Sequence, residues 1–414
     1  MKKIFLSLII IVVIVLAVVF GWALLSRPSG ETVGQAINNV LPFGSGEGLE
    51  QPTTNNQQPT TGEDGQVFDE FGRPTAGLFR VVVEPVAGAV AFTRGTSTVV
   101  RYVDRATGHV YETNLTTSKK TRITNKTLPK IYESYFRLDG QAVLLRSLKD
   151  DSDTVENLSL ALTPPKATST GSTSSPQADG LYTVSATVLR GDIGSVAVGL
   201  GNTLFYSLRD SGSIVSSAFN NTALKTIFSS VFTDWRLAAA GNGVIIYTKA
   251  SSNAPGYAYT LNTASGGLTR LLGPLNGLTV TPDASGTRLL YSYTESGLAK
   301  SSAKNLQSGA ITDILPVTLS EKCIWSVKNR GIVYCGSPVN GIGASEPDNW
   351  YKGATHFSDR LWRFDTNAEI AQILSEPKAS LGLDIDVVEL KLSPTEDYLI
   401  FINKKDLSLW ALRL

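Results

Sequence analysis

The two histidines are the first residues to weigh as catalytic groups, because nucleophilic catalysis needs a base beside the nucleophile and an acid that orients the base. His356 is followed by a serine and an aspartate, but neighbouring residues of an extended chain point to opposite faces. His109 follows a glycine turn, where we expect a structural or surface role. The sequence has no Gly-x-Ser-x-Gly turn, and no spacing of acidic residues singles out a carboxylate pair. We therefore assign no catalytic residue.

The two cysteines could form a disulfide. A turn centred on residues 328–330 would place Cys323 opposite Cys335 in an antiparallel hairpin. Directly opposed residues lie about 4.5 Å apart at Cα in a non-hydrogen-bonded pair, which is within disulfide range. Translocation across the membrane would supply an oxidising setting. The alternative is a pair of small buried thiols.

An aromatic pair lies in a polar, Pro- and Gly-rich insertion at residues 336–358. Tryptophan and tyrosine are enriched among the anchors of protein interfaces, so this insertion is our candidate partner-binding loop. The alternative is that the loop folds back and its tryptophan fills the blade surface. The candidate binding residues are Asp348, Trp350, Tyr351, Lys352 and His356.

The composition excludes several kinds of site. The 414 residues contain 37 Lys+Arg and 36 Asp+Glu, which gives a net charge of +1 and no electrostatic footprint for nucleic acid. Two histidines and two cysteines cannot form repeated zinc sites or an iron–sulfur cluster. We predict no metal, no cofactor and no nucleic-acid partner.

The N-terminus predicts a membrane anchor over residues 1–25. Lys2 and Lys3 precede an apolar run at residues 4–25, which as a helix would span roughly 33 Å, enough for the hydrocarbon core. The lysines place the N-terminus in the cytoplasm and the rest outside, in the periplasm or at the cell surface. A cleaved signal peptide is the alternative, but its apolar region is usually shorter.

Residues 26–76 contain almost nothing that could be buried, so we predict a disordered linker. A second polar segment, rich in Ser, Thr and Pro, lies at 164–179 and is predicted to be a flexible loop. Within the linker, the apolar patch 40–43 could instead dock on another surface.

The remainder, residues 77–414, is predicted to be all-β because short apolar runs alternate with Gly, Asn, Asp and Ser turns. One apolar strand recurs seven times, and four of the six spacings are 41–44 residues; the two longer ones each contain a polar insertion. This period indicates a seven-bladed β-propeller. The recurring strands are 99–102, 142–145, 203–206, 244–247, 288–291, 332–334 and 398–401.

The two ends of this domain predict how the ring closes. The chain stops after a segment typical of a third strand, so the last blade lacks its fourth strand. Residues 78–83 are apolar and precede the first complete blade. We expect them to supply the missing strand, because pairing removes two open edges.

The segment 392–401, a Ser-Pro-Thr-Glu-Asp turn followed by an apolar strand, resembles the repeats of TolB-type propellers within the WD-repeat-like group. Segments 280–291 and 138–144 look similar. The resemblance implies a propeller that binds proteins or serves as a scaffold.

Two classes of function remain open. The first is a membrane-tethered, extracytoplasmic, non-enzymatic scaffold for protein interaction or envelope assembly, including a subunit of a larger envelope machine. The alternative is a propeller that binds or processes glycans with carboxylates at the mouth of its central channel. Acidic residues beside aromatics at that mouth would favour the alternative.

Overall fold

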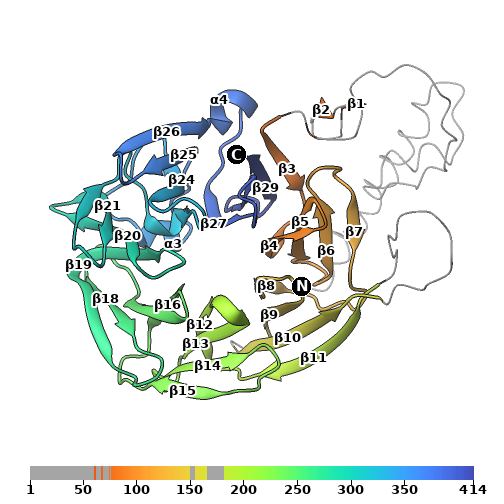
Figure 1. Cartoon of the computed structure of the whole chain (residues 1–414), viewed down its shortest axis with the longest axis horizontal. Coiled ribbons are helices and arrows are strands. Elements are labelled where there is room, and N and C mark those ends of the chain that lie inside the picture. The colour runs from red at the N-terminus through yellow and green to blue at the C-terminus, as the bar shows by residue number, and fades with distance from the viewer. Residues whose placement is uncertain (1–59, 62–66, 69–73, 75, 150–153, 166–180) are drawn as a thin grey trace, which may run out of the picture. The chain divides into compact units, whose positions relative to one another are not determined.

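The computed structural model describes residues 60–61, 67–68, 74, 76–149, 154–165 and 181–414 (Figure 1). The predicted anchor, most of the predicted linker and nearly all of the insertion at 164–179 lie outside these residues. No helix within the described part of the chain is long and apolar enough to span a bilayer.

The described chain from residue 76 onward forms seven four-stranded antiparallel units around a central axis (Figure 1). We number these blades one to seven along the chain. Blades one to three contain β4 (Val86–Arg94), β5 (Ser97–Asp104), β6 (Val110–Asn114), β7 (Lys120–Arg122), β8 (Ile131–Phe136), β9 (Ala142–Leu148), β10 (Val155–Thr163), β11 (Thr183–Leu189), β12 (Ile193–Val198), β13 (Thr203–Leu208), β14 (Ile214–Ala218) and β15 (Lys225–Phe228). Blades four to six contain β16 (Trp235–Ala240), β17 (Gly243–Thr248), β18 (Pro255–Leu261), β19 (Leu268–Pro282), β20 (Arg288–Glu295), β21 (Leu298–Asn305), β22 (Ile311–Asp313), β23 (Cys323–Trp325), β24 (Ile332–Pro338), β25 (Asp359–Asp365) and β26 (Ile370–Ser375).

Blade seven contains strands from both ends of the domain, β27 (Val387–Leu392), β28 (Tyr398–Asn403), β29 (Leu409–Arg413) and β3 (Leu78–Val82). The short elements are β1 (Thr60–Thr61), β2 (Val67–Phe68), η1 (Leu200–Asn202), η2 (Ser320–Lys322), α3 (Asp348–Tyr351) and α4 (Pro377–Leu381). β1 and β2 pair with each other inside the segment predicted to be linker.

Each of the seven recurring apolar segments is the second strand of a blade, as the period predicted. These strands have neighbours on both sides and on both faces, so they carry the most continuous apolar sequence. All residues of β24 and of β28 are buried. Blades four and five are continuous, because β19 pairs with β18 through its first half and with β20 through its second.

The predicted ring closure is confirmed. Leu78 pairs with Leu412 and Phe79 with Ala411, so β3 is the fourth strand of the blade whose other three strands end the chain. The pairing covers the edges of both β3 and β29, which would otherwise be open to other chains.

Seven hydrophobic clusters each lie between two neighbouring blades. For example, Ile245 and Tyr247 of blade four pack with Leu289 and Tyr291 of blade five. A four-stranded sheet has two apolar faces, and only stacking against a neighbour on each side buries both. The ring is therefore the unit that holds the core.

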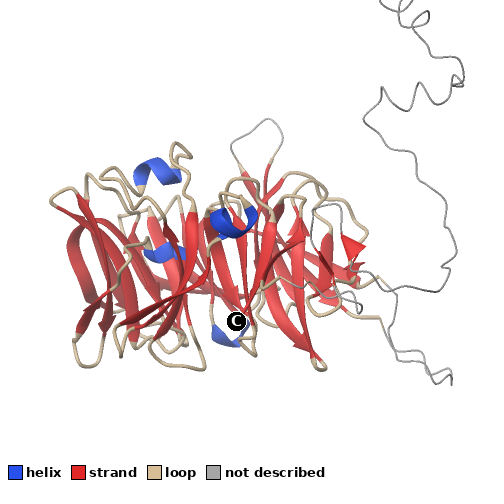
Figure 2. Ribbon diagram, turned by 90° about the horizontal axis from the view of Figure 1, so that it is seen from above, coloured by secondary structure: helices blue, strands red, loops and turns tan. Residues whose placement is uncertain are grey.

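The strands run between two faces of the ring (Figure 2). We call one of them the loop face; it carries the links between blades and the connections from second to third strands. The C-terminus follows a third strand and so lies at the opposite face, at the lower edge of Figure 2. Leu78 pairs with Leu412, so the chain also enters the ring at that opposite face.

Candidate functional site

The insertion predicted to bind a partner connects β24 to β25 on the loop face, and α3 is its only helix. Oδ2 of Asp348 accepts hydrogen bonds from Ser252 in blade four, 2.6 Å from the backbone N and 2.8 Å from Oγ. Burial acts to raise the pKa of Asp348, but these hydrogen bonds outweigh it and lower the pKa below its ordinary value. The loop is therefore fastened to a blade other than its own.

Trp350 is buried, with 5% of its surface exposed, and packs with Leu319 and Phe357. Its indole Nε1 lies 3.0 Å from Oδ2 of Asp386, to which it donates. This placement corresponds to the alternative in which the loop folds back and the tryptophan fills a gap. A partner on the loop face would not touch the indole ring directly.

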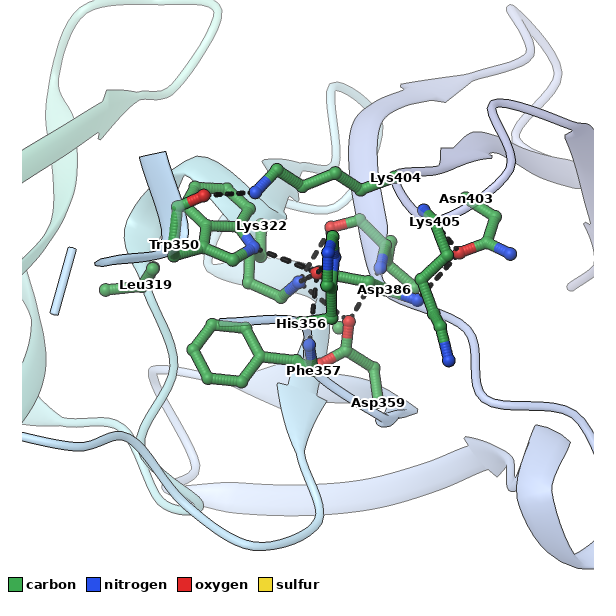
Figure 3. A network of polar contacts seen from close by, with 12 residues as sticks. Leu319, Lys322, Trp350, His356, Phe357, Asp359, Asp386, Asn403, Lys404 and Lys405 are labelled. Carbon is green, nitrogen blue, oxygen red and sulfur yellow. Dashed lines mark hydrogen bonds and ion pairs between the residues drawn. The ribbon is translucent and has the colours of Figure 1, made fainter. Parts of the chain in front are cut away.

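Lys322 lies beneath this tryptophan and is fully buried (Figure 3). Its Nζ is 2.5 Å from Oδ1 of Asp386 and 2.8 Å from Oδ2 of Asp359. It also donates to the backbone oxygen of Val387 at 3.0 Å. The side chains of Lys322, Asp359 and Asp386 have no exposed surface. We call these three residues the buried triad.

The two carboxylates of the buried triad have different surroundings. Asp386 accepts hydrogen bonds from Lys322, from the indole of Trp350 and from the backbone N of Phe357 at 3.1 Å. Asp359 accepts at Oδ2 only, while Oδ1 is buried without a hydrogen-bond partner among the described residues. Burial raises the pKa of Asp359 to about 6, although the charge of Lys322 opposes this shift.

The remaining predicted binding residues lie at the surface of the loop face. Tyr351 is 36% exposed and donates through its hydroxyl to Oε2 of Glu321 at 2.8 Å. Burial raises the pKa of Glu321 above its ordinary value, and the hydrogen bond from Tyr351 partly offsets this. Lys352 is exposed. His356 has 45% of its side chain exposed, with Nδ1 4.0 Å from Oδ2 of Asp386.

A cavity of about 400 Å³ lies between the two ends of the insertion and is lined by its own residues. His356 lines it together with residues from both ends of the loop, among them Pro338, Asn340, Glu346, Asn349 and Ser358. The loop therefore presents a hollow beside its exposed residues rather than a flat surface.

A second cavity, of about 310 Å³, lies at the start of the innermost strands of blades two, three and four, and we call it the mouth cavity. Its lining also includes residues of the neighbouring strands and links. Glu133 and Arg146 line it and form an ion pair at 2.6 Å. The hydroxyl of Tyr135, also in the lining, donates to Oε1 of Glu133 at 2.6 Å. Arg209 and Arg236 complete its charged lining with Asp234.

Glu389 belongs to the same end of the innermost strands. It occupies an irregularity in the pairing of β27 with β28, where its φ is +53°. Glu389 is exposed at the surface, but the protein packed around its carboxyl group limits hydration and raises its pKa to about 7; the charge of Lys391 opposes this shift and the charge of Glu133 adds to it. The charge of Glu133 in blade two thus acts on the pKa of Glu389 in blade seven, near the mouth cavity.

Cys323 and Cys335 lie opposite each other in β23 and β24, with the predicted register. Their Cα atoms are 4.1 Å apart, and the structure joins them in a disulfide. Within the described residues, no group of three or more His, Cys, Asp or Glu side chains is arranged to hold a metal ion.

The buried triad was not predicted from the sequence. A signal was present, because Asp386 interrupts an apolar run between Ile385 and Val387, where an aspartate is costly unless it is paired. The partner could not be found from spacing. Lys322 lies 64 residues earlier in a different inter-blade link.

No family model and no curated protein matches this chain. Among solved structures, oligogalacturonate lyase in complex with manganese is 10% identical, with a TM-score of 0.53, over 89% of this chain and 98% of that one. An oligogalacturonate lyase from Vibrio parahaemolyticus is 11% identical, with a TM-score of 0.52, over 86% and 96%. TolB from Acinetobacter baumannii is 13% identical, with a TM-score of 0.41, and the match covers 67% of this chain but only 63% of TolB.

These similarities concern the fold alone. The two lyase structures, with TM-scores above 0.5, show that this chain shares the β-propeller fold. The described part of the chain is thus an all-β propeller. Its activity has to be argued from its own residues.

Proposed function

We propose that the protein is a non-enzymatic binding propeller, held at the outside of the cytoplasmic membrane by residues 4–25, that serves as a protein-interaction or envelope-assembly scaffold. The partner would dock on the loop face, over the insertion at 336–358. A membrane-tethered scaffold needs a surface that is both exposed and fixed, since ordering a mobile loop on binding costs affinity.

One observation carries this proposal: the insertion is fixed by buried polar contacts while its tip is exposed. Asp348 and Trp350 fasten it to Ser252 and Asp386, and Tyr351 and Lys352 lie at its surface. The chain enters the ring at the opposite face, beside Leu412. The segment that precedes β3 therefore joins the ring at the face opposite the proposed docking surface.

The test is partner capture by proximity labelling in the native host with the full-length protein. Replacing Tyr351 and Lys352 together by alanine should remove the main partner, while the variant should still fold and unfold cooperatively. Val327 is exposed in the hairpin at the other end of β24, so Val327→Ala is a matched control on the opposite face. Unchanged capture by the double variant would refute docking at the insertion.

A second candidate is glycan binding at the mouth cavity, because acidic and aromatic side chains meet there. Glu133, Tyr135 and Arg146 are in contact, and Glu389 lies near enough for its charge to act on Tyr135. The two solved oligogalacturonate lyases give a first class of glycan to test. Calorimetric titration with oligogalacturonate would show binding that Glu133→Gln weakens; an absence of heat would remove this ligand from consideration.

A further inference from the structure

We propose that Lys322 and Asp359 become joined by an intramolecular amide bond, formed by the protein itself with Asp386 as the proton acceptor. Such a bond would link η2, between blades five and six, to the first residue of β25 in blade six. The proposal concerns the buried triad and does not depend on the binding functions proposed above.

The geometry of the buried triad favours amide formation. Nζ of Lys322 lies within hydrogen-bonding distance of both carboxyl groups, 2.8 Å from Asp359 and 2.5 Å from Asp386. The rings of Trp350 and Phe357 have their centroids 5.1 and 5.2 Å from Nζ. Groups held in contact in this way can react with effective concentrations of about 10⁵–10⁸ M.

The burial of all three side chains also favours amide formation. None of the three side chains has exposed surface, and one lysine faces two carboxyl groups, so the buried triad carries an unbalanced negative charge when all three are ionised. Burial penalises ions and favours neutral forms. A neutral amine and a neutral carboxylic acid are the reactive pair for amide formation, and exclusion of water opposes the reverse reaction, hydrolysis.

The hydrogen bonds distinguish the two carboxyl groups. Asp386 accepts hydrogen bonds from Trp350 and Phe357 as well as from Lys322, so these donors hold its carboxyl group beside Nζ, in position to take the proton. Oδ1 of Asp359 has no hydrogen-bond partner among the described residues, so this oxygen is free to leave. The raised pKa of Asp359 agrees with its assignment as the carboxylic acid that is attacked.

The reaction balances without a co-reactant. A proton of the Lys322 ammonium passes to the Asp386 carboxylate, and the free amine attacks Cγ of neutral Asp359. The new C–N bond forms, and the bond from Cγ to one carboxyl oxygen breaks. That oxygen leaves as water with its own proton and a second proton from the nitrogen. The products are a neutral amide, one water molecule and protonated Asp386.

The neighbourhood gives such a bond a structural purpose. Cys323 follows Lys322 directly and is joined to Cys335 in the structure, so the same segment would carry two covalent links. Asp359 ends the insertion at 336–358, so the amide would tie the base of the candidate docking loop to an inter-blade link.

The deciding measurement is the intact mass of the full-length protein after reduction and denaturation. We expect a mass lower than that of the sequence by one water molecule, and a protease digest containing a branched peptide that joins Lys322 to Asp359. Asp386→Asn should reduce the cross-linked fraction. A full mass for the wild-type protein would overturn the proposal, and so would a branch through Asp386.

Two lysine variants separate this reaction from dehydration elsewhere. Lys322→Arg keeps the positive charge but cannot form the amide, so it should have the full mass. Lys404 also lies over the Trp350 ring, at 4.5 Å, and Lys404→Arg should still lose one water. Loss of water that persists in Lys322→Arg would refute the proposed bond, and the wild-type digest decides the matter even if that variant does not fold.

Discussion

The indole Nε1 of Trp350 donates to Oδ2 of Asp386 over 3.0 Å, and both groups are buried. The tryptophan belongs to the insertion of blade six, and the aspartate to the link that leads into blade seven. This hydrogen bond therefore connects the candidate docking loop to the body of the ring. It also makes the position of the loop dependent on a residue that no partner needs to touch.

Trp350→Ala should destabilise the propeller by about 3–5 kcal/mol, since it leaves a cavity and removes a donor from a buried carboxylate. Trp350→Phe should cost less, about 1–3 kcal/mol, because an aromatic ring still fills most of the site although the donor and part of the volume are lost. Denaturant unfolding followed by tryptophan fluorescence and circular dichroism measures both. Equal stability of wild type and Trp350→Ala would contradict the buried position of this side chain.

Deletion of residues 76–84 should abolish cooperative unfolding, because it removes β3 and exposes the edge of β29. We expect aggregation or early loss of amide protection in blade seven, measured by hydrogen exchange. Removal of residues 1–57 is the control, since β3 stays in place. A folded, monomeric product lacking residues 76–84 would count against the closure.

Replacement of both cysteines by serine should lower the free energy of unfolding by about 3 kcal/mol if the purified protein contains the disulfide. Mass spectrometry without reduction, after alkylation, tests the bond directly. We expect no alkylated thiol at Cys323 or Cys335. Free thiols in the mature protein would favour the alternative of two small buried cysteines.

Ionisation of Glu389 should make the propeller less stable as the pH rises. Its pKa in the folded protein is about 7, above the ordinary value of 4.5, so the folded state binds this proton more tightly than the unfolded state. The stabilisation is complete below pH 4.5 and is lost as the pH passes through 7. Glu389→Gln should remove this step from a plot of unfolding free energy against pH; an identical profile would contradict the shift.

The architecture was predictable because its signal is periodic. Each second strand is buried on both faces, so its apolar sequence recurs at the blade period, and the shortage of one strand at the C-terminus pointed to residues 78–83. The register of Cys323 with Cys335 followed from the position of one turn. These features depend on residues that are close in sequence or on a pattern that repeats.

The site was less predictable because its contacts join unique positions on different links. The buried triad consists of Lys322, Asp359 and Asp386. These positions follow neither the blade period nor any other regular spacing in the sequence. The aromatic pair was recognised, but its two rings have different surroundings: Trp350 lies inside and Tyr351 outside. Which of these two adjacent aromatic side chains is buried depends on the residues beneath the insertion. Here the residue beneath Trp350 is Lys322, which belongs to the link between blades five and six.

The closure of blade seven also decides where a mechanical load would act. A pull on the chain before residue 77 reaches the ring at the pairing of Leu78 with Leu412. The same pairing holds β29, so a pulling force would act first on the hydrogen bonds between β3 and β29. The ring would open at blade seven under force, while the disulfide between β23 and β24 in blade six would still be intact.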